Sequence, residues 1–264
     1  MSDELLIYPE PFDDFDKQSL TFIGKTKNVY AAGSGPAVIV MSEMPGIYQL
    51  VADFVRTVRD EGFTVWMPDM FGKAGKPPST GYSLASMARA CISREFHAFS
   101  ANKSSPIVDW LRALAKHAHG VSGGKGVGAI GMCFSGNFTL NLMLEPSVLA
   151  PVLSQPSLPL GRKGGMHISP GELRCVKDRL ETEDLTVLGY CFEGDSFCPP
   201  ERFEEYRKAL GDRFQGKILP AASGRPGTDI SPHSVVTLHL IDEEGQPTRE
   251  ALDEILTFYK HRLK

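Results

Sequence analysis

Residues 126–145 read GVGAIGMCFSGNFTLNLMLE, and this segment joins two different apolar patterns through a short turn. Its first part, residues 126–132, is a continuous run of small and apolar residues, as in a strand that is buried on both faces of a sheet. Its last part, residues 136–145, has the apolar spacing of a helix. Cys133 lies between the two parts. We therefore expect a sharp strand–turn–helix unit with a thiol at its apex.

The residues two positions before and two positions after Cys133 are Gly131 and Ser135, which suit a turn where these positions crowd each other. The pattern is the G-x-S-x-G of a nucleophile elbow, with cysteine as the nucleophile and serine in the last small position. Such a turn presents its apex at the carboxyl edge of the sheet and at a helix N-terminus, which favours a thiolate. The Phe134 N–H then becomes a donor to an oxyanion. The alternative is a buried, inert cysteine, and the strand–turn–helix context favours the nucleophile.

Strand-like and helix-like runs alternate along most of the chain. We predict strands at residues 19–24, 27–33, 36–41, 63–69, 126–132, 148–154, 184–192 and 235–241. We predict helices at residues 48–62, 105–118, 136–145, 199–211 and 248–263. This alternation favours a doubly wound, mostly parallel α/β sheet with helices on both faces, opened by a hairpin. We expect a single domain over residues 1–264, in which the irregular residues 155–183 form a lid or an excursion over the sheet.

A cysteine nucleophile needs a base and a group that orients the base, and in this fold the chain order is nucleophile, acid, histidine. Asp195 follows the predicted strand 184–192, at the same sheet edge as the elbow, and Glu193 is its competitor. His233 lies in a loop just before the predicted last strand, whereas His239 falls inside that strand, where a packed residue is expected. We therefore favour Asp195 and His233 as the partners of Cys133.

Two other histidines follow the elbow in less suitable places. His167 lies in the irregular segment and His261 in the last predicted helix. For Asp195 the alternative role is a turn residue or a helix cap. Only the joint order Cys133, Asp195, His233 makes the catalytic interpretation preferable.

The strand at residues 36–41 leads into a loop that begins Ser42-Glu43-Met44-Pro45. In hydrolases of this fold the corresponding loop supplies the second oxyanion donor, so we expect the Met44 N–H to take that role. Glu43 would then lie near the thiol, where its carboxylate would oppose thiolate formation. The alternative for Glu43 is an ordinary solvated loop acid.

The composition argues against several classes of function. The formal net charge is −4 and we find no block of lysine and arginine, so we expect no nucleic-acid partner. The five cysteines form no C-x-x-C pair, which argues against a zinc site and against a disulfide framework, and suits a reducing cytoplasm. The acidic residues 1–16 do not resemble a signal peptide, and no apolar run is long enough to span a bilayer.

Several segments together carry a resemblance to a known family. They are PAVIVMSEMPGI at 36–47, DEGFTVWMPDMFG at 60–72, GAIGMCFSG at 128–136, FEGDSFCPPERF at 192–203 and PHS at 232–234. From about residue 36 to the last predicted helix, the chain resembles the dienelactone hydrolase family, of which carboxymethylenebutenolidase is the best-known member. The resemblance implies an α/β-hydrolase fold with a Cys133–His233–Asp195 triad. It also implies that Glu43 keeps the resting thiol protonated and releases it when substrate arrives.

The chain departs from the family pattern at three places. Ser135 stands where family members usually have glycine, and residues 155–183 are longer than in the short members. Dienelactone hydrolases anchor a substrate carboxylate with arginines, one of them just past the catalytic histidine, and this chain has none there. Arg94 and Arg225 are candidate anchors, with surface salt bridges as the alternative use. Dienelactone itself is therefore not the expected substrate.

These observations together predict a cofactor-independent hydrolase of a small-molecule ester or lactone, without a metal, that works through an acyl-enzyme on Cys133. A thioesterase is a close alternative. A glutamine amidotransferase pairs its cysteine with a late H-x-E motif, which neither His233 nor His239 begins. A hydrolase-fold protein that binds a ligand without turnover is the alternative from a different class. The oligomeric state is not predicted.

Overall fold

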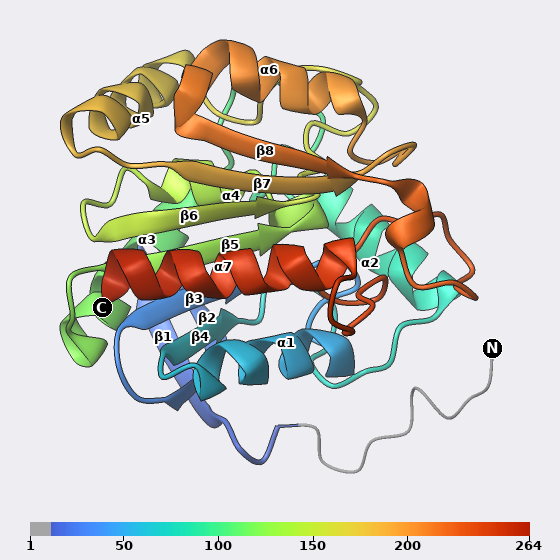
Figure 1. The fold of residues 1–264 in the computed structure, drawn as a ribbon. Helices are drawn as coiled ribbons and strands as arrows, with labels where there is room; N and C mark the ends of the chain where they lie inside the picture. Colours follow the sequence, from blue (N-terminus) through green and yellow to red (C-terminus); the bar gives the residue numbers. More distant parts are fainter. Residues whose placement is uncertain (1–11) are drawn as a thin grey trace.

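The computed structural model describes residues 12–264, and these residues form one eight-stranded sheet covered by helices (Figure 1). The strands are β1 Asp16–Phe22, β2 Lys25–Gly33, β3 Ala37–Met41, β4 Thr64–Pro68, β5 Val127–Met132, β6 Val148–Ser154, β7 Val187–Phe192 and β8 Phe214–Leu219. Their order across the sheet is β1-β2-β4-β3-β5-β6-β7-β8. The expected N-terminal hairpin is confirmed, because β1 and β2 pair antiparallel. The acidic residues 1–11 lie outside the described part of the chain.

Most of the sheet is parallel, as the alternation of strands and helices predicts. β2 pairs antiparallel with β4, and from β4 to β8 every neighbouring pair is parallel. The carboxyl ends of β3 and β5 to β8 therefore meet at one edge of the sheet, to which the arrowheads point in Figure 1. The turn after β5 and the loops after β3, β7 and β8 all emerge there.

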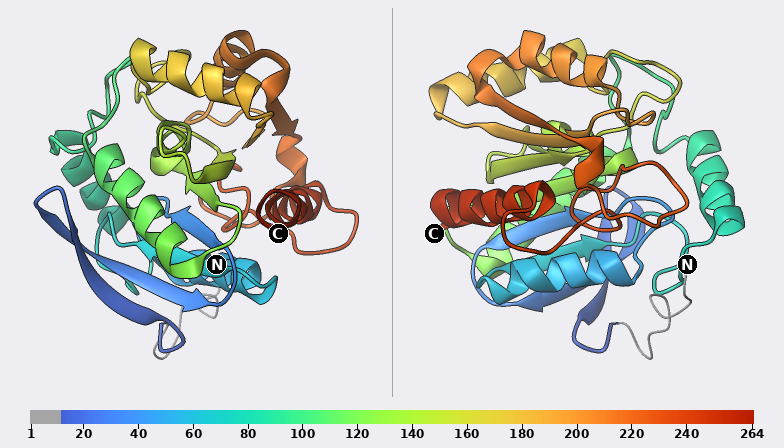
Figure 2. Two further views of the ribbon diagram at one scale, coloured as in Figure 1. Left: turned by 90° about the vertical axis from the view of Figure 1, so that its left-hand side faces the viewer. Right: turned by 45° about the vertical axis from the view of Figure 1, so that its right-hand side comes forward.

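Helices cover both faces of this sheet (Figures 1 and 2). The helices α1 Gln49–Asp60 and α7 Pro247–Leu263 lie on the face turned toward the viewer in Figure 1. The helices α3 Ile107–Ser122, α5 Pro170–Thr182 and α6 Pro200–Leu210 pack on a separate apolar cluster. Strand β3 explains why both clusters form, because alternate side chains of a strand point to opposite faces. Val38 and Val40 join the cluster of α1 and α7, whereas Ile39 and Met41 join the other.

The prediction of a last strand at residues 235–241 is wrong. The last strand is β8, and residues 235–239 form turns. β8 has a half-polar sequence, FQGKIL, because it lies at the edge of the sheet with alternating buried and exposed residues. Val235 and Val236 are buried in the core beside α7 without joining the sheet. A short apolar run can lie in a strand or in any other buried segment, so periodicity alone did not separate the two.

Two further segments differ from the expectations. Residues 155–183 are irregular only up to residue 169, since α5 occupies the rest with Ser169 as its N-cap. The helix α2 Thr80–Ile92 was not predicted, because its buried residues are only Ser86 and Ala90 and it lacks an apolar face. The helix after the elbow is short, with η2 Cys133–Ser135 leading to α4 Phe138–Leu142.

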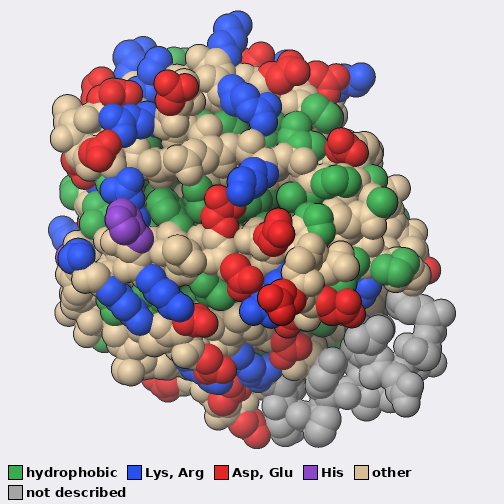
Figure 3. All heavy atoms as spheres, viewed as in Figure 1, with side chains coloured by type: hydrophobic (Ala, Val, Ile, Leu, Met, Phe, Trp, Pro, Cys, Tyr) green, Lys and Arg blue, Asp and Glu red, His purple; other side chains and the backbone are tan. Residues whose placement is uncertain are grey.

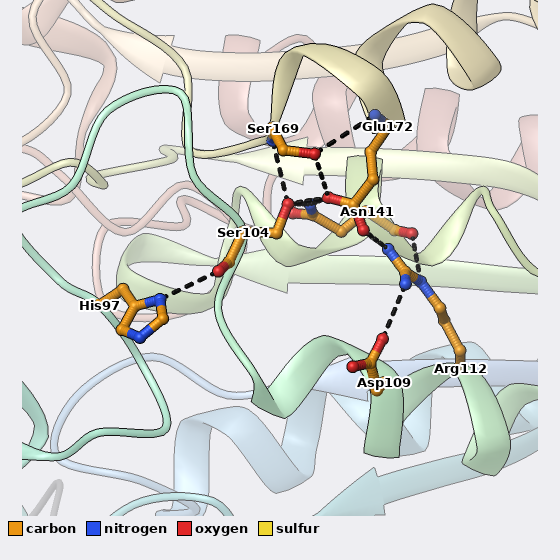
Figure 4. A network of polar contacts seen from close by, with 7 residues as sticks. All are labelled: His97, Ser104, Asp109, Arg112, Asn141, Ser169 and Glu172. Carbon is orange, nitrogen blue, oxygen red and sulfur yellow. Dashed lines mark hydrogen bonds and ion pairs between the residues drawn. The ribbon is translucent and has the colours of Figure 1, made fainter.

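A polar network fastens α5 to the core of the domain (Figure 4). Arg112 of α3 binds Glu172 of α5 at 2.5 Å and Asp109 at 2.8 Å. The Ser104 hydroxyl donates to the same Glu172 carboxylate and accepts from the Ser169 N–H at 3.0 Å. The network therefore joins α3, α5 and the segment before α3.

Charges on the surface are mixed. On the face seen in Figure 3, basic and acidic side chains are interspersed. Among the helices of residues 12–264, we find none that combines the length and the apolarity needed to cross a membrane.

Replacing Glu172 by Gln should lower the free energy of unfolding by about 1–2 kcal/mol, because the buried end of Arg112 loses a charged partner. Urea denaturation measures this change. Glu181→Gln is the matched control, since Glu181 pairs with Arg213 at 3.4 Å while its side chain is 69% exposed. The control should change stability by about 0–0.5 kcal/mol. Equal losses in the two variants would contradict an anchoring role for the network.

Candidate active site

The turn after β5 has the geometry of a nucleophile elbow. Cys133 has φ of +54°, a conformation that L side chains rarely adopt. A Cβ atom on Gly131 would lie 2.3 Å from the carbonyl oxygen of Ser135, so only glycine fits two positions before the apex. A Cβ on Gly136 would lie 2.6 Å from Cα of Pro156. The small residues are therefore required by close backbone approaches on both sides of the thiol.

The hydroxyl of Ser135 ties the elbow to the neighbouring strand. It accepts a hydrogen bond from the Met132 N–H at 3.0 Å and lies 2.8 Å from the carbonyl oxygen of Met41, to which it donates. Met41 is the last residue of β3, and its register partner in β5 is Gly131. Serine at this position thus adds a link that a glycine would lack.

The two expected oxyanion donors lie on either side of this junction. Phe134 follows the apex directly, and its fully buried ring packs against Phe71, Phe96 and Phe138. Met44 lies in the loop after β3, at the same carboxyl edge. The aromatic cluster holds the ring of Phe134 in place, and the register of Met41 with Gly131 brings the loop after β3 to the same edge of the sheet as the elbow.

Asp195 and His233 form a buried pair. The Nδ1–H of His233 donates to Oδ2 of Asp195 at 2.7 Å, and the side chains are 7% and 1% exposed. The other carboxylate oxygen, Oδ1, accepts from the N–H groups of Phe197 at 2.9 Å and Cys198 at 3.2 Å. Asp195 is therefore oriented by the backbone, and it holds the imidazole in one tautomer.

The second ring nitrogen of His233 is left available. Nε2 is buried and has no hydrogen-bond partner among residues 12–264. Burial lowers the pKa of His233, but the charge of Cys133, the hydrogen bond to Asp195 and the contact with the Cys133 side chain outweigh it and raise that pKa well above its usual value. The charge of Cys133 contributes to this shift, and the shortest contact of His233 with a predicted site residue is the 2.7 Å bond to Asp195.

His239 binds the backbone next to His233, so it is not a second candidate for the base. Its Nδ1 accepts from the N–H groups of His233 at 3.2 Å and Ser234 at 3.1 Å, and its Nε2 lies 3.0 Å from the Thr228 hydroxyl. Burial lowers the pKa of His239. It is a packed residue, as expected, although it lies in a turn and not in a strand.

Three further residues were alternatives for the acid or the base, namely Glu193, His167 and His261. Glu193 and His261 are exposed. His167 is buried, with Nε2 2.6 Å from the Ser105 hydroxyl and Nδ1 2.9 Å from the carbonyl oxygen of Ser100. Burial lowers the pKa of His167 to about 4. His167 thus ties the segment after β6 to the segment before α3.

Glu43 is 2% exposed, so it is not a solvated loop acid. Its Oε1 accepts from the hydroxyls of Tyr48 at 2.5 Å and Thr237, and its Oε2 accepts from Ser234 at 2.6 Å and Gln155 at 3.2 Å. None of these four donors is Cys133. Burial, followed by the charge of Glu43, raises the pKa of Tyr48 well above its usual value, and Cys133 adds to this effect.

The sequence offered little sign of these four partners, because they come from three distant segments. Tyr48 lies five residues after Glu43, whereas Ser234 and Thr237 lie in the turn that was taken for a strand. The one available signal was the position of Ser234 next to His233.

A cavity of about 430 Å3 opens beside the pair, and Ser157 and Asp195 are part of its wall. Apolar side chains line much of it: Pro159, Leu160, Phe197, Pro199 and Pro200. The ring of Phe197 lies 5.4 Å from that of His233. Arg162 and Lys163 also line the cavity.

The structure does not bring the two candidate anchors to this cavity. Arg94 is exposed in the loop after α2. Arg225 lines a different cavity, of about 180 Å3, with Asp53 and Asp242. Within residues 12–264, no group of histidine, cysteine, aspartate and glutamate is arranged to hold a metal ion.

The sheet order, the elbow and the carboxylate–histidine pair define an α/β-hydrolase fold. The model of the dienelactone hydrolase family matches residues 21–157, more than half of the chain, including Glu43 and Cys133. The chain belongs to the dienelactone hydrolase family, which places it among the hydrolases. Asp195 and His233 lie beyond the matched residues. A comparison with curated proteins gave no match.

Solved structures agree on the fold. A protein from Klebsiella pneumoniae, described as a "Putative Dienelactone Hydrolase", is 16% identical with a TM-score of 0.63, covering 93% of this chain and 98% of its own. A dienelactone hydrolase from Anabaena variabilis is 11% identical with a TM-score of 0.59, covering 95% and 100%. The thioesterase domain from the curacin biosynthetic pathway is 11% identical with a TM-score of 0.53, covering 92% and 99%.

Glycine in place of Cys133 should give a more stable protein than alanine in the same place. Alanine at positive φ pays the cost of a left-handed conformation, whereas glycine does not. Glycine loses more backbone entropy on folding, but this cost is smaller, so the free energy of unfolding should be higher by about 0.5–1 kcal/mol in the glycine variant. Urea denaturation of Cys133→Gly and Cys133→Ala measures the difference. If the glycine variant were the less stable of the two, the elbow would store no backbone strain.

Asp195→Asn should destabilise the protein in a pH-dependent way. Since the pKa of His233 is raised on folding, the charged pair contributes fully below the usual histidine pKa of about 6.5, and its contribution is lost as the pH rises through the raised value. The loss relative to wild type should therefore be largest at about pH 6 and should shrink toward alkaline pH. Denaturation at several pH values tests this expectation. A difference that does not vary with pH would argue against a charged His233–Asp195 pair.

Proposed function

We propose that this protein hydrolyses carboxylic ester or lactone bonds through Cys133, His233 and Asp195, without a cofactor. One observation carries the proposal. His233 is fixed by Asp195 at 2.7 Å through one ring nitrogen, while its other nitrogen is buried and unpartnered beside an elbow cysteine. The Cys133 charge contributes to the raised pKa of this imidazole, so His233 takes up the thiol proton as the thiolate forms.

The reaction follows from this arrangement. The Cys133 thiol transfers its proton to Nε2 of His233, and the sulfur attacks the substrate carbonyl carbon. The carbonyl oxygen gains the negative charge, which the Phe134 and Met44 N–H groups stabilise. When the tetrahedral intermediate collapses, the C–O bond breaks and the imidazolium gives its proton to the leaving alkoxide. In a lactone the freed hydroxyl stays on the acyl chain, so hydrolysis of the thioester releases a single hydroxy acid.

The second half-reaction uses water. His233 removes a proton from a water molecule, which attacks the thioester carbonyl and forms a second tetrahedral intermediate. This intermediate expels the Cys133 sulfur, which recovers its proton from the imidazolium. Asp195 stays ionised and stabilises the positive charge of His233 in both halves.

Glu43 enters this scheme as a buried carboxylate in the loop after β3. Burial and four neutral hydrogen-bond donors hold its carboxylate in place. We assign to it the role of opposing the thiolate until a substrate carbonyl is present, because a nearby like charge disfavours a second anion.

Thioesters are a further substrate class for the same machinery, because a thioester carbonyl is attacked in the same way. A structural neighbour is a thioesterase domain. The apolar wall of the cavity is compatible with the acyl chain of an ester or of a thioester. All five cysteines are free thiols, which fits action in the reducing cytoplasm.

Cys133→Ala should abolish the hydrolysis of p-nitrophenyl acetate, lowering kcat by at least about 10³-fold, because the nucleophile is removed. Cys175→Ala is the control, since Cys175 is an exposed residue of α5 and should keep full activity. A parallel panel of thioesters and lactones defines the preferred acyl donor.

Undiminished turnover in Cys133→Ala would overturn the assignment of the nucleophile. A wild-type protein that is stabilised by these compounds yet forms no product would be a ligand-binding protein of this fold.

A further inference from the structure

Ser157 lies against the sulfur of Cys133. It follows β6 by three residues and is 1% exposed. Its Oγ lies 3.6 Å from Sγ of Cys133, a hydrogen-bond distance for sulfur, and its N–H donates to the carbonyl oxygen of Cys133 at 3.0 Å. Ser157 therefore contacts the elbow residue with both its backbone and its side chain.

The hydroxyl of Ser157 has one partner. Among residues 12–264, its hydrogen bond is to Cys133 Sγ. A neutral thiol and a hydroxyl can exchange donor and acceptor roles, but a thiolate has no proton. When Cys133 ionises, the hydroxyl of Ser157 must be the donor. Hydrogen bonds to charged acceptors are the stronger kind, so this contact strengthens as the thiolate forms.

The surroundings hold Ser157 in this position. The buried guanidinium of Arg202 donates to the carbonyl oxygens of Leu158, Pro159 at 3.1 Å and Arg162 at 2.7 Å. The Leu158 N–H donates to Oδ1 of Asn137 at 3.2 Å. The segment after β6 is thus fastened to α6 and to the helix that follows the elbow, so the hydroxyl is set before the reaction begins.

Charged and titratable groups surround the sulfur from other elements. His233 and Asp195 come from the loops after β8 and β7, and Glu43 and Tyr48 come from the loop after β3. The carboxylate of Glu43 disfavours the thiolate, and protonated His233 favours it. Ser157 is a neutral residue that contacts the sulfur and also lines the cavity.

We propose that Ser157 is a further catalytic residue, whose hydroxyl donates a hydrogen bond to the Cys133 sulfur and stabilises the thiolate from which the attack begins. The inference rests on Cys133 as the proposed nucleophile. It explains how a thiolate forms next to the buried Glu43, because the hydroxyl adds a second donor besides the imidazolium.

Ser157→Ala tests this role through the alkylation of Cys133 by iodoacetamide, followed by peptide mass spectrometry across pH. The readout reports the thiolate and does not depend on turnover. At about neutral pH we expect the alkylation rate to fall about tenfold, and the pH of half-maximal rate to rise by about one unit. The kcat for p-nitrophenyl acetate should fall by a similar factor, with KM nearly unchanged.

Ser147→Ala is the matched control, since Ser147 is a buried serine just before the opposite end of β6. It should alkylate like the wild type. Ser157→Thr keeps a hydroxyl and should restore most of the rate. Ser157→Gly removes the hydroxyl without adding atoms and replaces the alanine variant if that variant does not fold.

An unchanged alkylation profile in a folded Ser157→Ala or Ser157→Gly protein would overturn the inference. Equal losses in the threonine and alanine variants would also overturn it, because packing and not the hydroxyl would then be responsible. Activity that survives Cys133→Ala refutes the proposed nucleophile instead, whatever the alkylation of Ser157→Ala shows.

Discussion

The left-handed turn at Cys133 is the constraint on which the site depends. A non-glycine residue at positive φ costs about 1–2 kcal/mol, so the surrounding structure must hold it in place. Three features do so: Gly131 allows the backbone of Ser135 to approach, the Ser135 hydroxyl joins the elbow to β3, and the ring of Phe134 is buried among aromatic side chains. Together they direct the sulfur to the sheet edge where the loops of Asp195 and His233 also end.

Hydrogen bonds hold the buried charged groups of the site, in addition to the pair of His233 and Asp195. Glu43 accepts from four neutral donors, Asp195 from two backbone N–H groups and His233, and Arg202 donates to three carbonyl oxygens. Such partners satisfy a buried charge without neutralising it. In the proposed mechanism these charges act on the sulfur, with Glu43 disfavouring the thiolate and His233 and Ser157 favouring it.

Contacts from several elements fasten the elbow and the segments beside it. The hydroxyl of Ser135 donates a hydrogen bond to the carbonyl oxygen of Met41 in the neighbouring strand. The segment after β6 is fastened by Arg202, by His167 and, through α5, by the network of Arg112 and Glu172. These contacts fasten an irregular segment that lines the cavity and whose Ser157 lies against the thiol.

The sequence alone determined the features that local chemistry controls. Buried parallel strands are continuous apolar runs, so β3, β5 and β6 were predicted, and the small residues around Cys133 identified the elbow. The chain order of acid and histidine singled out Asp195 and His233, which the structure joins at 2.7 Å. Only the tertiary structure decided what depends on distant partners. It placed β8 at a half-polar edge, made a turn of residues 235–239, and surrounded Glu43 with donors from three segments. It also brought Ser157 to the sulfur, because contacts between residues far apart in the chain leave no local pattern.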